Sequence, residues 1–137
     1  MKPDFHQFDD IPGTTIFTME KAREGFHLNQ FCMSLRKEEN RTRFLANERT
    51  YLDEWEMTEE QKQAVLARDF QKMLDTGGNV YFLSKIFASE GLSYVQAVST
   101  MTDMNPEQYQ AMMVAGGRNI EGWRSKKARA KQEGGEA

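Results

Sequence analysis

Apolar residues recur along this chain at spacings that fit the period of an α-helix. Leu28, Phe31, Cys32 and Leu35 stand at offsets that fall on one helical face. Their spacing predicts a helix over 27–36 that turns this face toward a core or a partner. Few residues are β-branched and helix formers dominate, so the same kind of element is expected through most of the chain.

Capping residues indicate where several helices begin and end. Thr18 can cap a first helix, and Asn40 is expected to cap the segment that runs through 44–45. Thr58, followed three residues later by Gln61, has the pattern of a capping box. The helix that it opens is expected to continue to Gly77, a residue suited to a left-handed cap.

The segment 80–87 (VYFLSKIF) fits two interpretations. Its β-branched and aromatic residues favour a strand, whereas its spacing also fits a helix. Because it is apolar on nearly all sides, we interpret it as a buried helix that ends at Gly91. Ser93 then caps a short helix over 94–101, and Asn105 with Pro106 begins a last helix.

These elements predict an all-α fold with at least five helices and a long irregular N-terminal segment. The last helix is expected to stop at Gly116 and Gly117. A single helical domain over 1–117 follows, with a loose tail over 118–137. The length of 137 residues and a charged fraction of 28% fit one globular domain, not a disordered chain.

Composition also limits where the chain is expected to work. It has no apolar run of the length that crosses a bilayer, and residues 1–10 are too polar for a signal peptide. Cys32 is its one cysteine, lies between Phe31 and Met33, and is expected to be a buried, unreactive thiol. A cytoplasmic protein that does not enter membranes is therefore expected.

The net charge of −3 is unevenly distributed. Residues 118–137 hold six Lys or Arg against three Glu, so the rest of the chain is more acidic than the total suggests. An acidic body cannot offer a broad surface for phosphates. A basic tail can touch nucleic acid, but such a tail is more often a solvated terminus, and no nucleic-acid partner is expected.

The sequence offers no convincing catalytic or metal site. A non-haem iron triad needs two His and one carboxylate, and the two histidines are His6, in the irregular N-terminal segment, and His27. No spacing relates one to the other. No set of nucleophile, base and orienting residue is readable either. We therefore expect neither catalytic residues nor metal ligands in this chain.

Aromatic residues and methionine are abundant for so small a core. The chain has nine Met, nine Phe, four Tyr and two Trp. These residue types are enriched at the centres of protein interfaces. Their number mildly favours a subunit that packs on a larger partner over a protein that stands alone.

Several ordered blocks resemble the α (small) subunit of protocatechuate 4,5-dioxygenase. The resemblance covers about residues 8–125, and nothing transfers from it to the tail. The blocks include 8–14 (FDDIPGT), 28–31 (LNQF), 51–55 (YLDEW), 64–69 (AVLARD), 77–85 (GGNVYFLSK) and 116–118 (GGR).

The resemblance implies a part in an enzyme whose chemistry lies elsewhere. Such dioxygenases are extradiol enzymes that open catechol-type rings with O₂, at Fe(II) held by two His and one carboxylate of a larger β subunit. The helical α subunit covers that site, typically in an α2β2 assembly. The isolated chain is therefore expected to be inactive. Protocatechuate is the default substrate, and gallate or a related catechol acid is also credible.

The resemblance also suggests which residues approach the substrate. In this family the segment after the Gly-Asn-Val-Tyr block nears the pocket, and here that segment is 91–94, with Ser93 and Tyr94 as the candidate lid residues. The family position that matches Tyr94 is aromatic and often Phe, so the hydroxyl here changes the expected pocket polarity. A packed aromatic at the start of a helix is an equally good interpretation of Tyr94.

Two other classes of function stay open from the residues alone. One is a stand-alone helical binding module, and the other is a nucleic-acid-binding domain that uses the basic tail. An adjacent gene product with a His-His-Glu iron set would decide in favour of the dioxygenase.

Overall fold

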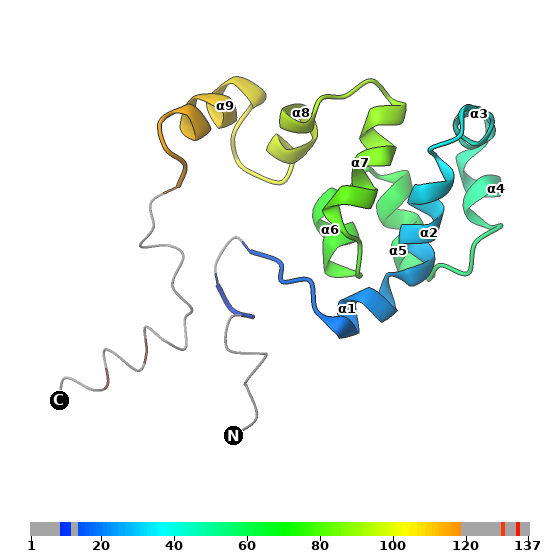
Figure 1. Cartoon of the computed structure of the whole chain (residues 1–137), viewed down its shortest axis with the longest axis horizontal. Coiled ribbons are helices and arrows are strands. Elements are labelled where there is room, and N and C mark those ends of the chain that lie inside the picture. Colours follow the sequence, from blue (N-terminus) through cyan, green and yellow to red (C-terminus); the bar gives the residue numbers. More distant parts are fainter. Residues whose placement is uncertain (1–8, 12–13, 119–129, 131–133, 135–137) are drawn as a thin grey trace. The chain divides into compact units, whose positions relative to one another are not determined.

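The computed structural model describes residues 9–11, 14–118, 130 and 134, and within them every regular element is a helix (Figure 1). The nine helices are α1 (Met19–Glu24), α2 (Phe26–Ser34), α3 (Glu38–Ala46), α4 (Glu48–Leu52), α5 (Glu59–Leu66), α6 (Phe70–Asp75), α7 (Val80–Ser89), α8 (Tyr94–Ser99) and α9 (Pro106–Val114). The predicted all-α class is confirmed. Most of the predicted tail and residues 1–8 lie outside the described residues.

The chain divides into two compact units. One is Phe17–Gln110, and the other combines Met1–Ile16 with Ala111–Ala137, so the division falls inside α9. Within the first unit, α2 packs on α7, α3 on α4, and α5 on α6. The functional argument concerns this unit, because it contains the core and the candidate lid residues.

Two groups of aromatic rings fill the core of the Phe17–Gln110 unit. Phe31 of α2 meets Phe44 and Tyr51 with ring centroids 5.2 and 5.9 Å apart. Phe70 of α6 meets Phe87 of α7 edge to face at 5.6 Å. The stripe predicted on 27–36 is part of this core, since Leu28, Phe31, Cys32 and Leu35 are all buried.

Most of the predicted caps are present. The hydroxyls of Thr18, Thr58 and Ser93 each accept a hydrogen bond from a backbone amide in the first turn of the helix that follows. Asn105 accepts from the amide of Gln108 at 2.8 Å, at the start of α9. These caps are local interactions, which is why the sequence predicts them.

The cap predicted at Asn40 is wrong. The helix α3 begins at Glu38, after Lys37, and Asn40 lies inside its first turn. Its side chain donates instead to the carbonyl oxygen of Ser34 at 2.9 Å, and so satisfies the end of α2. The capping residue that the sequence analysis missed is Asn47, whose side chain accepts from the amide of Thr50 at the start of α4.

Two further expectations need correction. The helix predicted from Thr58 to Gly77 is two helices, because the chain turns at Arg68 between α5 and α6. The segment 80–87 is a helix, as interpreted, but it is not buried on nearly all sides. Leu83, Ile86 and Phe87 face the core, while Val80 and Tyr81 are exposed.

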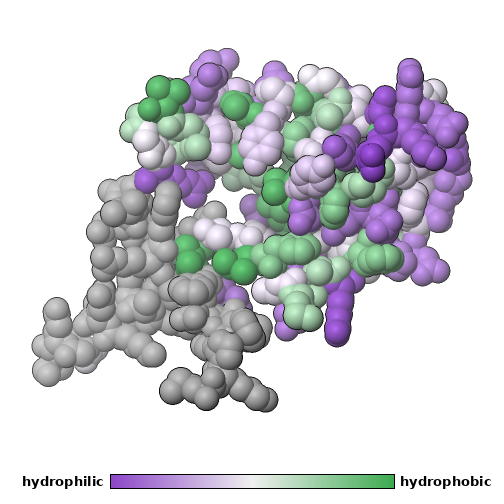
Figure 2. Space-filling model, in the orientation of Figure 1, coloured by the Kyte–Doolittle hydropathy of each residue, from purple (hydrophilic) through white to green (hydrophobic). Residues whose placement is uncertain are grey.

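Hydrophobic side chains are also exposed outside α7. Figure 2 shows hydrophilic residues over α3 and α4, and hydrophobic ones along the segment that leads into α1 and on α1. Phe17, Met19 and Phe26 are among these exposed residues. In the described part of the chain, no helix is both long enough and apolar enough to pass through a bilayer.

Candidate functional site

Helix α7 leads to the candidate lid residues, and its first turn is held by a buried amide of α2. The side chain of Asn29 donates to the carbonyl oxygen of Gly77 at 3.1 Å and accepts from the amide of Asn79 at 2.9 Å. Asn79 in turn accepts from the amide of Tyr81 and so caps α7. Because both groups of the Asn29 amide are used, α2 fixes the point from which α7 starts.

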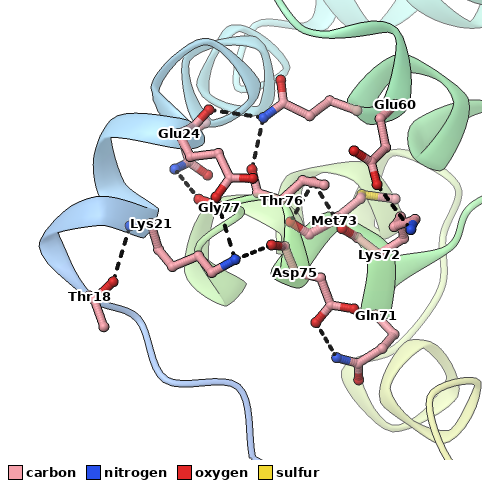
Figure 3. Close-up of polar contacts among 12 residues, drawn as sticks. Thr18, Lys21, Glu24, Glu60, Gln71, Lys72, Met73, Asp75, Thr76 and Gly77 are labelled. Atoms are coloured by element: carbon pink, nitrogen blue, oxygen red, sulfur yellow. Dashed lines mark hydrogen bonds and ion pairs between the residues drawn. The ribbon is translucent and has the colours of Figure 1, made fainter. Parts of the chain in front are cut away.

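A second buried amide and a lysine fix the end of α6 against α1 (Figure 3). Gln61, only 1% exposed, donates to the carbonyl oxygens of Glu24 at 3.0 Å and Thr76 at 2.8 Å. Lys21 reaches from α1 to the carbonyl oxygen of Asp75. Unsatisfied carbonyls in such a place would be costly, so these bonds stabilise one arrangement of the turn before α7.

The far end of α7 turns the chain sharply toward the candidate lid. The amide of Gly91 donates to the carbonyl oxygen of Ala88 at 3.1 Å, and that of Leu92 donates to Phe87 at 3.0 Å. Gly91 has a φ of +74°, which is a left-handed conformation that glycine adopts cheaply. This pair of bonds is a Schellman ending, which stops α7 and directs the chain into 91–94.

Ser93 and Tyr94, the two predicted lid residues, lie together at the start of α8. Ser93 accepts from the amide of Gln96 at 3.1 Å, and Gln96 accepts from the amide of Ser93 at 2.8 Å. The ring of Tyr94 is 55% exposed and meets the buried ring of Phe87 edge to face at 6.0 Å. Ser93 is therefore used as a cap, while Tyr94 presents much of its ring at the surface.

Arg68 supplies a feature that the sequence analysis missed. Its guanidinium lies between two carboxylates, with Nη1 at 2.7 Å from Glu48 of α4 and Nη2 at 2.6 Å from Glu90 at the end of α7. It also lies 5.4 Å from the centroid of the Phe44 ring. Burial lowers the pKa of Arg68, but the bonds to Glu90 and Glu48 outweigh it, so the net shift is upward.

The groups considered for chemistry do not form a metal site. The imidazole of His27 lies 3.5 Å from a carboxylate oxygen of Glu56. Among the described residues, no three His, Cys, Asp or Glu side chains gather where they could hold a metal ion. These residues therefore do not fit the two-His, one-carboxylate triad of a non-haem iron centre. His6 lies outside the described residues.

The prediction for Cys32 is confirmed. Its side chain is fully buried in α2, and the thiol is free. Burial raises the pKa of this thiol far above its ordinary value, although a backbone hydrogen bond opposes the shift. A thiol that stays protonated is a poor nucleophile.

The comparisons with known proteins bear on this helical unit. Residues 28–114 match the family described as the aromatic-ring-opening dioxygenase LigAB, LigA subunit. The chain belongs to this family. The match includes Arg68, Ser93 and Tyr94, so the LigA family region contains every element of the site just described. The resemblance to the α subunit of an extradiol dioxygenase is thereby confirmed.

A curated relative carries the same region within a longer protein. The chain is 25% identical over 101 residues to gallate dioxygenase of Pseudomonas putida. The match covers 74% of this chain but only 30% of that protein. The chain thus spans less than a third of the length of the relative that it matches.

Proposed function

We propose that this chain is the non-catalytic α subunit of a heteromeric class III extradiol dioxygenase. In this proposal it covers an Fe(II) site that belongs to a larger β subunit, and the two chains form an α2β2 assembly. The substrate is protocatechuate or a related catechol acid such as gallate, and O₂ is the co-substrate. The observation that carries the proposal is the LigA subunit match over 28–114.

The length of the relative supports a division of the enzyme between two chains. More than two thirds of gallate dioxygenase has no counterpart here. A separate subunit that corresponds to that remainder would supply the iron ligands, which the described residues of this chain do not offer. Accordingly, no chemical step is assigned to a residue of this chain.

The work proposed for this chain is to close the pocket. A cover excludes bulk water from a reaction that passes through reactive oxygen species, and it strengthens the electrostatic interactions inside. It also shapes the space that selects the substituent on the ring. The half-exposed ring of Tyr94 is suited to such a role, because its apolar face and its hydroxyl are both accessible.

Co-expression with the neighbouring β chain tests the proposal. We expect the purified complex to consume O₂ with protocatechuate or gallate, and the isolated chain to bind no stoichiometric iron and open neither ring. One tightly bound iron in each isolated chain would overturn it. A stable monomer that ignores the β chain in a pull-down would instead favour a stand-alone binding module.

A further inference from the structure

Arg68 occupies a backbone position that elsewhere in this chain is given to glycine. The helices α6, α7 and α9 end with Gly77, Gly91 and Gly116 in a left-handed conformation. At each of these ends, the same two backbone hydrogen bonds close the last turn.

The end of α5 has this pattern as well, with arginine in place of glycine. The amide of Arg68 donates to the carbonyl oxygen of Val65 at 3.0 Å, and that of Asp69 donates to Ala64 at 2.9 Å. Its φ is +54°, and within the described residues Arg68 is the one residue other than glycine with a positive φ. A side chain raises the free energy of this conformation, so an arginine here suggests work that glycine cannot do.

The side chain of Arg68 connects elements that are distant in sequence. Its Nε and Nη2 lie 2.7 and 2.6 Å from one oxygen of Glu90, while its Nη1 lies 2.7 Å from Glu48. Nη1 also donates to the carbonyl oxygen of Val65. Two N–H groups on one carboxylate oxygen hold Glu90 more firmly than a single contact would.

Glu90 stands directly before the segment that carries the candidate lid residues. It is the C-cap of α7, and Gly91 follows it with no atom within 4 Å of where a β-carbon would be. Gly91 therefore gives the segment freedom that packing does not remove. The ion pair to Arg68 is the contact that fixes the chain immediately before this free point.

We infer that Arg68 is a positioning residue for the substrate pocket, which holds Glu90 and thereby sets where Ser93 and Tyr94 stand. This inference rests on the proposed function. Arg68 does not touch the substrate in this proposal; it acts through the end of α7. Loss of the Arg68–Glu90 pair should loosen the 91–94 segment while the aromatic core stays intact.

The two carboxylate partners of Arg68 allow a matched test in the complex with the β chain. Glu90→Gln and Glu48→Gln each remove one charge from the same guanidinium, at sites of similar exposure. We expect Glu90→Gln to raise KM for the catechol acid by about fivefold, which corresponds to one charge-assisted hydrogen bond. Glu48→Gln should leave KM within about twofold, with a similar loss in Tm, because its partner helix α4 does not lead to the lid.

A third variant separates the backbone of residue 68 from its side chain. Arg68→Gly relieves the left-handed strain, so the subunit stays folded, yet it should raise KM as Glu90→Gln does. The double variant Arg68→Gly with Glu90→Gln should add nothing further. Equal KM values for Glu90→Gln and Glu48→Gln would overturn the inference while leaving the proposed function intact. A wild-type complex that opens no catechol ring would overturn both.

Discussion

Gly25 and Gly77 bring two turns of the backbone into direct contact. A β-carbon built on Gly25 would lie 1.9 Å from the carbonyl oxygen of Gly77, and one on Gly77 would lie 2.4 Å from the amide nitrogen of Gly25. No side chain fits at either position. The junction of α1 and α2 can therefore approach the turn before α7 closely enough for Asn29 to bond to both of its ends.

We expect Gly25→Ala to destabilise the chain by about 2 kcal/mol or more, because the new methyl group meets backbone atoms that cannot move aside. The φ of Gly25 is −93°, which alanine adopts freely, so the effect would come from the collision alone. Urea unfolding followed by circular dichroism measures it. Gly91→Ala is the control, since it has open space but a positive φ and should cost only about 1 kcal/mol.

The thiol of Cys32 should be unreactive while the chain is folded. Burial raises its pKa, so almost no thiolate forms at pH 8, and no reagent reaches the sulfur. We expect an aromatic disulfide reagent to modify it only after denaturant unfolds the chain. Rapid modification in native buffer would show that α2 opens readily, contrary to its full burial.

The ion pair of Arg49 and Glu59 predicts an acid-dependent part of the stability. The guanidinium contacts the two carboxylate oxygens at 2.6 and 2.9 Å, and its hydrogen bonds, with help from Gln63, lower the pKa of Glu59 to about 2. A lowered pKa stabilises the folded state at pH values above about 4, the usual range of a free Glu, and this contribution is lost as the pH falls toward 2.

We therefore expect Glu59→Gln to flatten the dependence of stability on pH between about 4 and 2, with little change in shape at neutral pH. Urea unfolding at a series of pH values would measure this. The pair is exposed, so the effect should be small and should shrink in 1 M salt, where charges are screened over about 3 Å. An unchanged slope in the variant would show that the pair contributes nothing in solution.

The helices were predictable where the deciding interactions are local. Thr58 and Gln61 form a capping box that depends on four consecutive residues, and the sequence shows it directly. The other bonds of Gln61, to Glu24 and Thr76, depend on tertiary contacts and could not be predicted. The same limit explains Asn40, which suits a cap locally but bonds to the previous helix instead.

Arg68 shows why the candidate site was predicted only in part. A left-handed arginine carries none of the signal that glycine gives, so the break between α5 and α6 was missed. Asp69, which caps α6, was the one local indication of a new helix. The positions of Ser93 and Tyr94 after Gly91 followed from the sequence, but the exposure of the Tyr94 ring depends on how α7 and α8 pack.

Tyr94 allows a direct test of whether the lid contacts the substrate. In the reconstituted complex, we expect Tyr94→Phe to change KM or substrate preference by a factor of about ten or less, since one hydrogen bond contributes about 1 kcal/mol. Tyr94→Ala should lower kcat/KM further, because loss of the ring opens the pocket to water. Neither change should alter the iron content of the complex, as the metal is proposed to belong to the β chain.

The exposure of Tyr94 makes this test clean. A fully buried aromatic cut to alanine costs about 3–5 kcal/mol, but a ring that is 55% exposed and packed on one side should cost much less. The subunit should then stay folded, and a kinetic effect can be assigned to the pocket. Tyr81→Phe is the control, because Tyr81 is an exposed tyrosine at the opposite end of α7, and its hydroxyl should not affect KM. Wild-type kcat/KM in the Tyr94→Ala complex would remove Tyr94 from the lid.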